Sequence, residues 1–181
     1  MKRLSAIFVT WLAGGLLAGC VPNAASYYAP SVADGQVVTS GHCVPLPTDA
    51  VFQVGTLPAR ARVMEGYRST YIAVRLGSDL MTTSDPKPSW RTFHFTRDRF
   101  LVRDLARNVD MTFDKVMNRD RSLPVTAPTI APYWLEIHLP KPVPASFELI
   151  SPSIVVDGQE YPFPPIKFER KLWVGISPFN C

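Results

Sequence analysis

The chain has 181 residues, a length that suits one domain, and its 19 Lys and Arg against 15 Asp and Glu give a net charge of +4. This balance does not supply the basic stripe that nucleic-acid binding requires, so nucleic acid is not expected as a partner. The 18 prolines fall between short apolar runs, which argues against long helices and favours many short strands.

The first twenty residues have the order of a secretory signal. Lys2 and Arg3 are followed by an almost wholly apolar run from Leu4 to Leu17, and small residues precede Cys20. The run is shorter than the roughly 20 residues that cross a hydrocarbon core, and glycines interrupt it, so a retained spanning helix is the weaker interpretation. Removing residues 1–19 would take away two of the basic residues and most of the apparent basicity.

The motif Leu17-Ala18-Gly19-Cys20 resembles the lipobox of bacterial lipoproteins. The resemblance implies cleavage before Cys20, a diacylglyceryl group on its thiol, and acylation of the new amine by a fatty acid such as palmitate. Two or three acyl chains hold a protein durably on a membrane. Val21 stands where many Gram-negative lipoproteins retained in the inner membrane carry aspartate, so the resemblance implies the outer membrane, facing the periplasm. The alternative is an ordinary cleaved signal peptide followed by a chance cysteine.

These features divide the chain into a signal peptide (1–19), a lipidated N-terminus with a flexible tether (20–40) and a single β-sandwich domain (41–181). The tether is expected because residues 20–40 are poor in charge and rich in small and turn-forming residues. Tyr27 and Tyr28 are expected to be mobile there, although docking of this pair on the domain or on a partner stays open.

Two cysteines remain once Cys20 is assigned to lipid. In an oxidising periplasm Cys43 and Cys181 are expected to form a disulfide that closes nearly the whole domain into one loop. Loop-entropy estimates give such a bridge about 4.7 kcal/mol for a ~100-residue loop. Two unpaired thiols are the alternative, because the sequence does not show whether the two Cα atoms approach each other.

The domain is expected to be a succession of short strands. Residues 71–76 and 91–96 have the composition and alternation of half-buried strands. Residues 97–121 are ambiguous. Leu101, Leu105 and Val109 recur at helical spacing, but several pairs of like charge would lie four residues apart on a helix. Two strands joined near residues 106–108 are therefore preferred. Residues 93–103 also match 147–157 in their apolar pattern, a weak sign of a duplicated hairpin.

The clearest strand is Tyr133–Leu139, which lies between Pro132 and Pro140 and places its odd-numbered apolar residues on one face. Asp157-Gly158 lies between residues 153–156 and 161–163 with the spacing of a tight hairpin. Two further strands are expected at 166–169 and 172–176. Many short strands without crossover helices predict an all-β fold, an antiparallel β-sandwich of the immunoglobulin-like kind. The cysteine and tryptophan spacing of antibody domains is absent, so only the architecture is predicted.

No residue pattern points to catalysis. The histidines His42, His94 and His138 are scattered, and His94 and His138 fall on solvent-facing strand positions. His42 adjoins Cys43, but no CxxC or HExxH pair completes a metal-ligand set, and no glycine loop for phosphate is present. We therefore expect no enzyme activity, no metal and no cofactor.

Four arginines form the main candidate contact surface. On an extended segment Arg97, Arg99, Arg103 and Arg107 would share one face and could contact anionic lipid headgroups or an acidic partner. A solvated face or a guarded sheet edge is the simpler interpretation. The aromatic residues Trp134, Trp173 and Phe179 are expected to serve in core or edge packing and not as a sugar-binding platform.

These observations favour a non-enzymatic outer-membrane lipoprotein of the bacterial envelope, a β-sandwich interaction or assembly module with an envelope protein as partner. The membrane contact would be the lipid anchor on Cys20. The alternative is a periplasmic lipoprotein that binds a small ligand or glycan, which would require a concave apolar pocket. A hydrolase is a third hypothesis, and it would require a histidine within hydrogen-bond reach of a nucleophile in a cleft.

Overall fold

The computed structural model describes residues 20–40, 44–77, 91–113 and 124–178. These residues form strands and turns, and none of their segments is a helix able to cross a membrane. The strands are β1 (Cys20–Val32), β2 (Gln36–Ser40), β3 (Leu46–Val54), β4 (Leu57–Glu65), β5 (Thr70–Leu76), β6 (Thr92–Phe95), β7 (Phe100–Asp104), β8 (Val109–Phe113), β9 (Thr129–Ile130), β10 (Tyr133–Leu139), β11 (Ser146–Ile150), β12 (Ile154–Val156), β13 (Gln159–Tyr161) and β14 (Ile166–Pro178).

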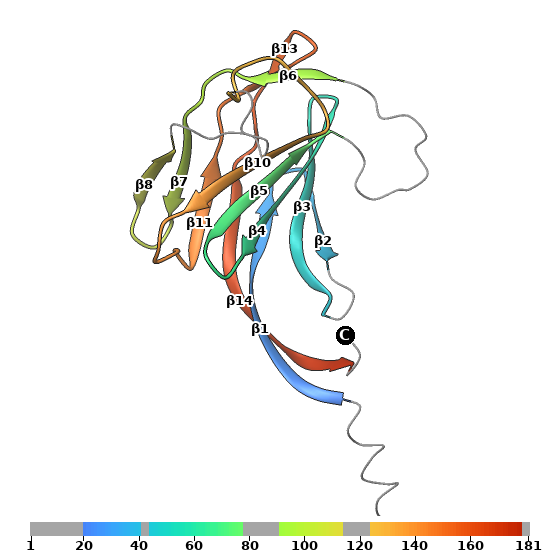
Figure 1. Cartoon of the computed structure of the whole chain (residues 1–181), viewed down its shortest axis with the longest axis vertical. Helices are drawn as coiled ribbons and strands as arrows, with labels where there is room; N and C mark the ends of the chain where they lie inside the picture. Colours follow the sequence, from blue (N-terminus) through green and yellow to red (C-terminus); the bar gives the residue numbers. More distant parts are fainter. Residues whose placement is uncertain (1–19, 41–43, 78–90, 114–123, 179–181) are drawn as a thin grey trace, which may run out of the picture.

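The strands form three antiparallel sheets packed around one core (Figure 1). Sheet A has the order β1-β14-β11-β7-β8, sheet B the order β10-β5-β4-β3-β2, and sheet C the order β13-β12-β6-β9. The prediction of an all-β, antiparallel, sandwich-like fold is confirmed. Its immunoglobulin-like subclass stays a prediction.

Aromatic rings join the three sheets in the core. Phe95 of sheet C lies 5.1 Å from Phe100 of sheet A, measured between ring centroids, and 6.0 Å from Phe163. Phe163 in turn meets Phe52 of sheet B edge-on at 5.4 Å. Such tilted and edge-to-face contacts are the favoured arrangements for aromatic pairs. The sheets are therefore held by direct contacts between inward-facing residues that alternate with polar ones along each strand.

The strongest local patterns are confirmed. Strand β10 has the predicted bounds, and its odd-numbered residues face the core. The β12–β13 hairpin turns at Asp157 and Gly158, whose φ angles of 49° and 88° are both positive, as a two-residue type I′ turn requires. Residues 166–176, predicted as two strands, belong to the single strand β14.

The ambiguous charged segment forms strands where the structure describes it. Strands β7 and β8 pair across a turn at residues 105–108, as preferred over a helix, and residues 114–121 lie outside the described part. Asp104 ends β7 with its side chain buried, and its Oδ1 accepts hydrogen bonds from the backbone N–H groups of Ala106 and Arg107 at 2.9 and 3.1 Å. The turn is thus closed by a carboxylate of its own strand.

The two segments that match in sequence lie side by side. Strand β6 pairs with β12 in sheet C, and β7 pairs with β11 in sheet A, so both segments pass between the same two sheets in opposite directions. The matched apolar positions of both segments are buried, namely Phe93, Phe95, Phe100, Val102, Phe147, Leu149, Ile154 and Val156. The shared pattern therefore follows from one shared packing role, and a duplication stays a hypothesis.

The prediction of a flexible tether over residues 20–40 is wrong. Strand β1 pairs with β14 over its whole length, from Cys20 opposite Pro178 to Val32 opposite Ile166, and β2 pairs with β3. Tyr28, expected to be mobile, is 2% exposed and packs on Phe147 with ring centroids 5.4 Å apart. Backbone pairing with a strand more than 130 residues later orders a segment whose side chains are mostly small.

Candidate functional site

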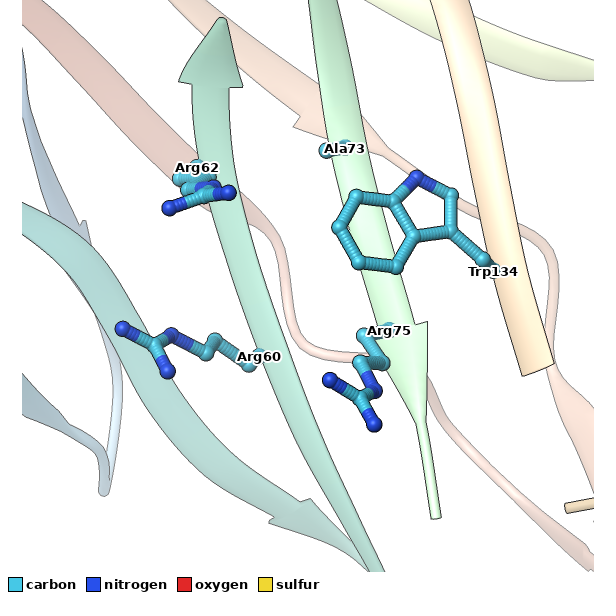
Figure 2. Close-up of a pocket in the computed structure, with 5 residues that line it drawn as sticks. All are labelled: Arg60, Arg62, Ala73, Arg75 and Trp134. Carbon is cyan, nitrogen blue, oxygen red and sulfur yellow. The ribbon is translucent and has the colours of Figure 1, made fainter. Parts of the chain in front are cut away.

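The outer face of sheet B carries a small hollow where three arginines meet a tryptophan (Figure 2). On β4, Ala59 and Ala61 point into the core, so Arg60 and Arg62 point outward. The lining residues are Arg60, Arg62, Ala73, Arg75 and Trp134, from β4, β5 and β10. We call these five residues the arginine face.

Cross-strand register brings these side chains together. Trp134 of β10 lies opposite Arg75 of β5, and Arg75 lies opposite Arg60 of β4, so the three form one row across the sheet. Ala73 lies opposite Arg62 in the next row. Its small side chain leaves the space that the larger neighbours surround. Directly opposed residues on an antiparallel pair have Cβ atoms only about 5 Å apart, so the charges of Arg60 and Arg75 repel each other.

A buried carboxylate offsets part of this positive charge. The side chain of Asp49 on β3 is fully buried, and its Oδ2 accepts a hydrogen bond from Nη2 of Arg60. Arg62 Nε lies 3.9 Å from Asp49 Oδ1. Both Asp49 Oδ1 and Arg60 Nε are buried without a hydrogen-bond partner among the described residues. Arg60 is therefore tied to the protein on one side while its Nε donor is left unsatisfied.

Arg75 stands over the indole ring. Its guanidinium carbon lies 5.9 Å from the centroid of Trp134, a cation–π distance. Partial burial, and then the positive charge of Arg60, lower the pKa of Arg75. An arginine remains protonated at neutral pH even so. Arg75 is thus a partly buried cation beside a second cation.

Glu136 adds a second carboxylate on the same face of β10. It lies opposite Ala73, and its Oε2 is 3.4 Å from Nε2 of His138. The imidazole of His138 also stacks on Tyr71 with ring centroids 5.2 Å apart. Three arginines thus face two carboxylates, one of which has a histidine beside it. The local charge stays positive.

The size of the hollow limits what can bind in it. Its volume is about 70 Å³. Pockets that hold whole small molecules measure roughly 300–1,000 Å³. The hollow therefore has room for one charged group, such as a carboxylate or a phosphate, and arginines bind such groups with paired, charge-assisted hydrogen bonds.

The four arginines predicted from sequence do not form one surface on a single strand. Arg97 and Arg99 precede β7, and Arg107 lies in the turn that follows it. Arg103 is within β7 and forms an ion pair with Asp110, with bonds of 2.8 and 3.1 Å. The predicted common face is wrong, because the segment is not extended throughout and Arg103 already has an acidic partner.

The remaining predicted residues are placed as follows. Cys20 is the first residue of β1. Cys43, Cys181, His42 and Phe179 lie outside the described residues, so the disulfide stays a prediction. His138 is exposed on sheet B and His94 is half-buried on β6. Among the described residues, no three His, Cys, Asp or Glu side chains gather as a metal site would require.

A second depression lies at the opposite edge of sheet B. It is a wide groove of about 900 Å³ between the β1–β2 turn, the β3–β4 turn and the link that follows β13. Tyr161 and Phe163 line it together with four prolines, and Asp34 is the charged residue in its lining. The ring of Tyr161 packs on Gly55. A Cβ atom added at Gly55 would lie 2.6 Å from the nearest carbon of that ring. Its size is that of a ligand site, but few charged groups converge on it.

Sequence reasoning missed the arginine face and placed Trp134 in core or edge packing. The alternation Ala59-Arg60-Ala61-Arg62 was the available signal, since it predicts a strand with two arginines on one face. The addition of Arg75 and Trp134 depends on strand register, which is not local. Comparisons of the chain with protein-family models, with curated proteins and with solved structures found no match.

Proposed function

We propose that this chain is a non-enzymatic lipoprotein of the bacterial outer membrane whose β-sandwich is an interaction module. Its arginine face binds an acidic group presented by an envelope protein. The observation that carries the proposal is the pairing of Arg60 with Arg75 across β4 and β5. Like charges directly opposed on a sheet destabilise it, and a bound carboxylate or phosphate would reverse that cost.

Three further features support an anionic group as the occupant. The buried Nε of Arg60 is a donor without an acceptor among the described residues. Arg75 and Trp134 together offer a cation and an aromatic surface, the residue types that dominate binding hot spots. The volume of about 70 Å³ suits one acidic group carried by a larger partner better than a complete free ligand.

The envelope location is proposed from the N-terminal sequence. The apolar run and the lipobox-like motif ending at Cys20 support a lipid anchor, and Val21 supports the outer membrane. An anchored protein meets its partners within a thin layer, where a modest contact surface suffices because the effective concentration is high.

In-cell crosslinking of the full-length chain, followed by affinity capture and mass spectrometry, tests the proposal. The test variant is Arg62→Gln with Arg75→Gln, which keeps the Arg60–Asp49 bond intact. The matched control is Arg97→Gln with Arg107→Gln, which changes the charge equally away from sheet B. We expect a protein that wild type and control capture equally and that the test variant captures about tenfold less, as loss of charged hydrogen bonds predicts.

The outcomes separate the parts of the proposal. Equal capture by the test variant would exclude the arginine face as the binding site. Failure of the wild type to capture any protein reproducibly would contradict the proposal of an interaction module. A Cys20→Ser chain should lose the partner if anchoring is required. Capture should also weaken with rising salt, because exposed charges are screened.

A small-ligand or glycan-binding lipoprotein is the second candidate, favoured by the wide groove beside Tyr161. Aromatic rings and proline surfaces suit an apolar ligand or a sugar face. A Tyr161→Ala variant that loses binding of an extracted envelope component, while Arg75→Gln keeps it, would favour this candidate.

A further inference from the structure

Strands β1 and β14 continue together beyond the body of the molecule as a two-stranded ribbon (Figure 1). Pairing of β14 with β11 ends at Glu169, and from Arg170 onward β14 pairs with β1 among the described strands. We define the ribbon as residues 20–27 with 171–178. It is stiffer than a linker, because every residue of one strand has a partner on the other.

One face of the ribbon is apolar and exposed. Within the body this face is core, with Phe168 opposite Pro30 and buried. Because side chains alternate along a strand, Leu172 and Val174 continue the same face beyond the core. They are 69% and 70% exposed. Ser26 and Ala24, their partners on β1, leave the apolar surface uncovered.

The ribbon carries little charge. Residues 20–33 are uncharged, and at the base of the ribbon Arg170 and Lys171 are ion-paired with Glu65 and Glu169, each at 3.3 Å. A protein partner would also accept the apolar pair, but the lipid anchor proposed at Cys20, on the same ribbon, favours lipid.

The position of Cys20 supplies the second argument. Cys20 begins β1 directly after the apolar run 4–17, so acyl chains on Cys20 or the apolar run itself would enter the bilayer at the tip of the ribbon. Val174 lies opposite Ala24, four residues from Cys20. At about 3.3 Å per residue this separation is roughly 13 Å. An anchored tip therefore keeps Val174 close to the headgroup layer.

We infer that the apolar face of the ribbon lies on a lipid surface, with Leu172 and Val174 dipping into it. The ribbon then fixes the orientation of the sandwich on the membrane instead of letting it swing on a tether. This inference rests on the proposed membrane anchor and is independent of the arginine face.

Site-specific photocrosslinking in cells tests it on the full-length chain. Val174 is replaced by a benzophenone amino acid, with Leu172 as a second probe position and Val109 as the matched control. Val109 is an exposed strand valine of the β7–β8 hairpin, 53% accessible, away from the ribbon. We expect at least about tenfold more phospholipid adduct at positions 172 and 174 than at 109, since burial of one such side chain shifts an equilibrium by about that factor.

Other products would overturn the inference. A protein adduct at position 174, including one to a second copy of this chain, would make the ribbon a protein interface. Equal lipid labelling at 109 and 174, or none at either ribbon position in a correctly exported chain, would also remove it. The Arg62→Gln with Arg75→Gln chain should label lipid normally, so failure of the arginine face and failure of the ribbon give different results.

Discussion

The hydroxyl of Tyr28 donates a 3.0 Å hydrogen bond to the carbonyl oxygen of Pro144, 116 residues later. This bond fastens the N-terminal strand to the link between β10 and β11, at the place where the ribbon leaves the body. The guanidinium of Arg170 lies 5.7 Å from the ring centroid of Tyr28. The base of the ribbon is therefore a packed joint.

Removing this bond should loosen β1 while the ring stays packed. We expect Tyr28→Phe to lower the free energy of unfolding by about 1 kcal/mol, the usual net value of one hydrogen bond. Tyr28→Ala should cost about 3–5 kcal/mol, because it also leaves a cavity beside Phe147. Urea denaturation of both variants measures the difference. Equal losses in the two would mean that packing of the ring contributes nothing.

Arg60 should matter more for stability than Arg75. Arg60→Ala leaves the buried carboxylate of Asp49 without its hydrogen-bonded partner, which should cost about 3–5 kcal/mol. Adding Asp49→Asn to Arg60→Ala removes the uncompensated charge and should recover part of that loss. A double-mutant cycle by chemical denaturation tests this coupling. A double variant less stable than Arg60→Ala would contradict the compensating role given to Arg60.

Asp104 should stabilise the β7–β8 turn through its two backbone hydrogen bonds. We expect Asp104→Ala to lower the free energy of unfolding by about 1–3 kcal/mol, because two donors lose their acceptor. Asp104→Asn keeps an acceptor oxygen at the same place and is the matched control, with a smaller loss. Thermal unfolding of both variants decides the matter, and equal losses would show that the hydrogen bonds are not the cause.

The lowered pKa of Asp157 predicts that the protein loses stability in acid. The hydrogen bond from Arg91 lowers the pKa of Asp157, and the N–H of Thr92 adds to this effect. Because the folded-state pKa is lowered, this contribution is complete above the ordinary pKa of about 4 and is lost as pH falls through the lowered value. Denaturation midpoints of wild type should therefore fall as the pH drops below about 4 and through the lowered pKa. Those of Asp157→Asn should fall less over that range, and parallel curves would exclude the effect.

The predicted bridge between Cys43 and Cys181 has a direct test. Alkylation of the unreduced, denatured protein should leave Cys43 and Cys181 unmodified, and peptide mass spectrometry should find the two cysteines linked. A Cys43→Ser, Cys181→Ser chain should lose stability of the order of 2–5 kcal/mol, the usual cost of removing a native disulfide from a small secreted domain. Full alkylation without reduction would show that the bridge does not form.

Local sequence patterns determined the elements that depend on near neighbours. Alternation between Pro132 and Pro140 predicted β10 to the residue, and Asp157-Gly158 predicted the hairpin because both positions require positive φ. The apolar pattern of residues 93–103 and 147–157 marked core positions, since burial on one face of a strand imposes a period of two.

The sequence by itself therefore determined an all-β fold, most strand positions from residue 71 onward and the lipobox-like motif at Cys20. Only the tertiary structure decided that residues 20–32 are a strand, because the pairing that orders them is with β14, which lies more than 130 residues later in the chain. It also assembled the arginine face, since Arg60, Arg75 and Trp134 become neighbours through the register of β4, β5 and β10. Register arises from the packing of the whole sheet, so no window of sequence contains it.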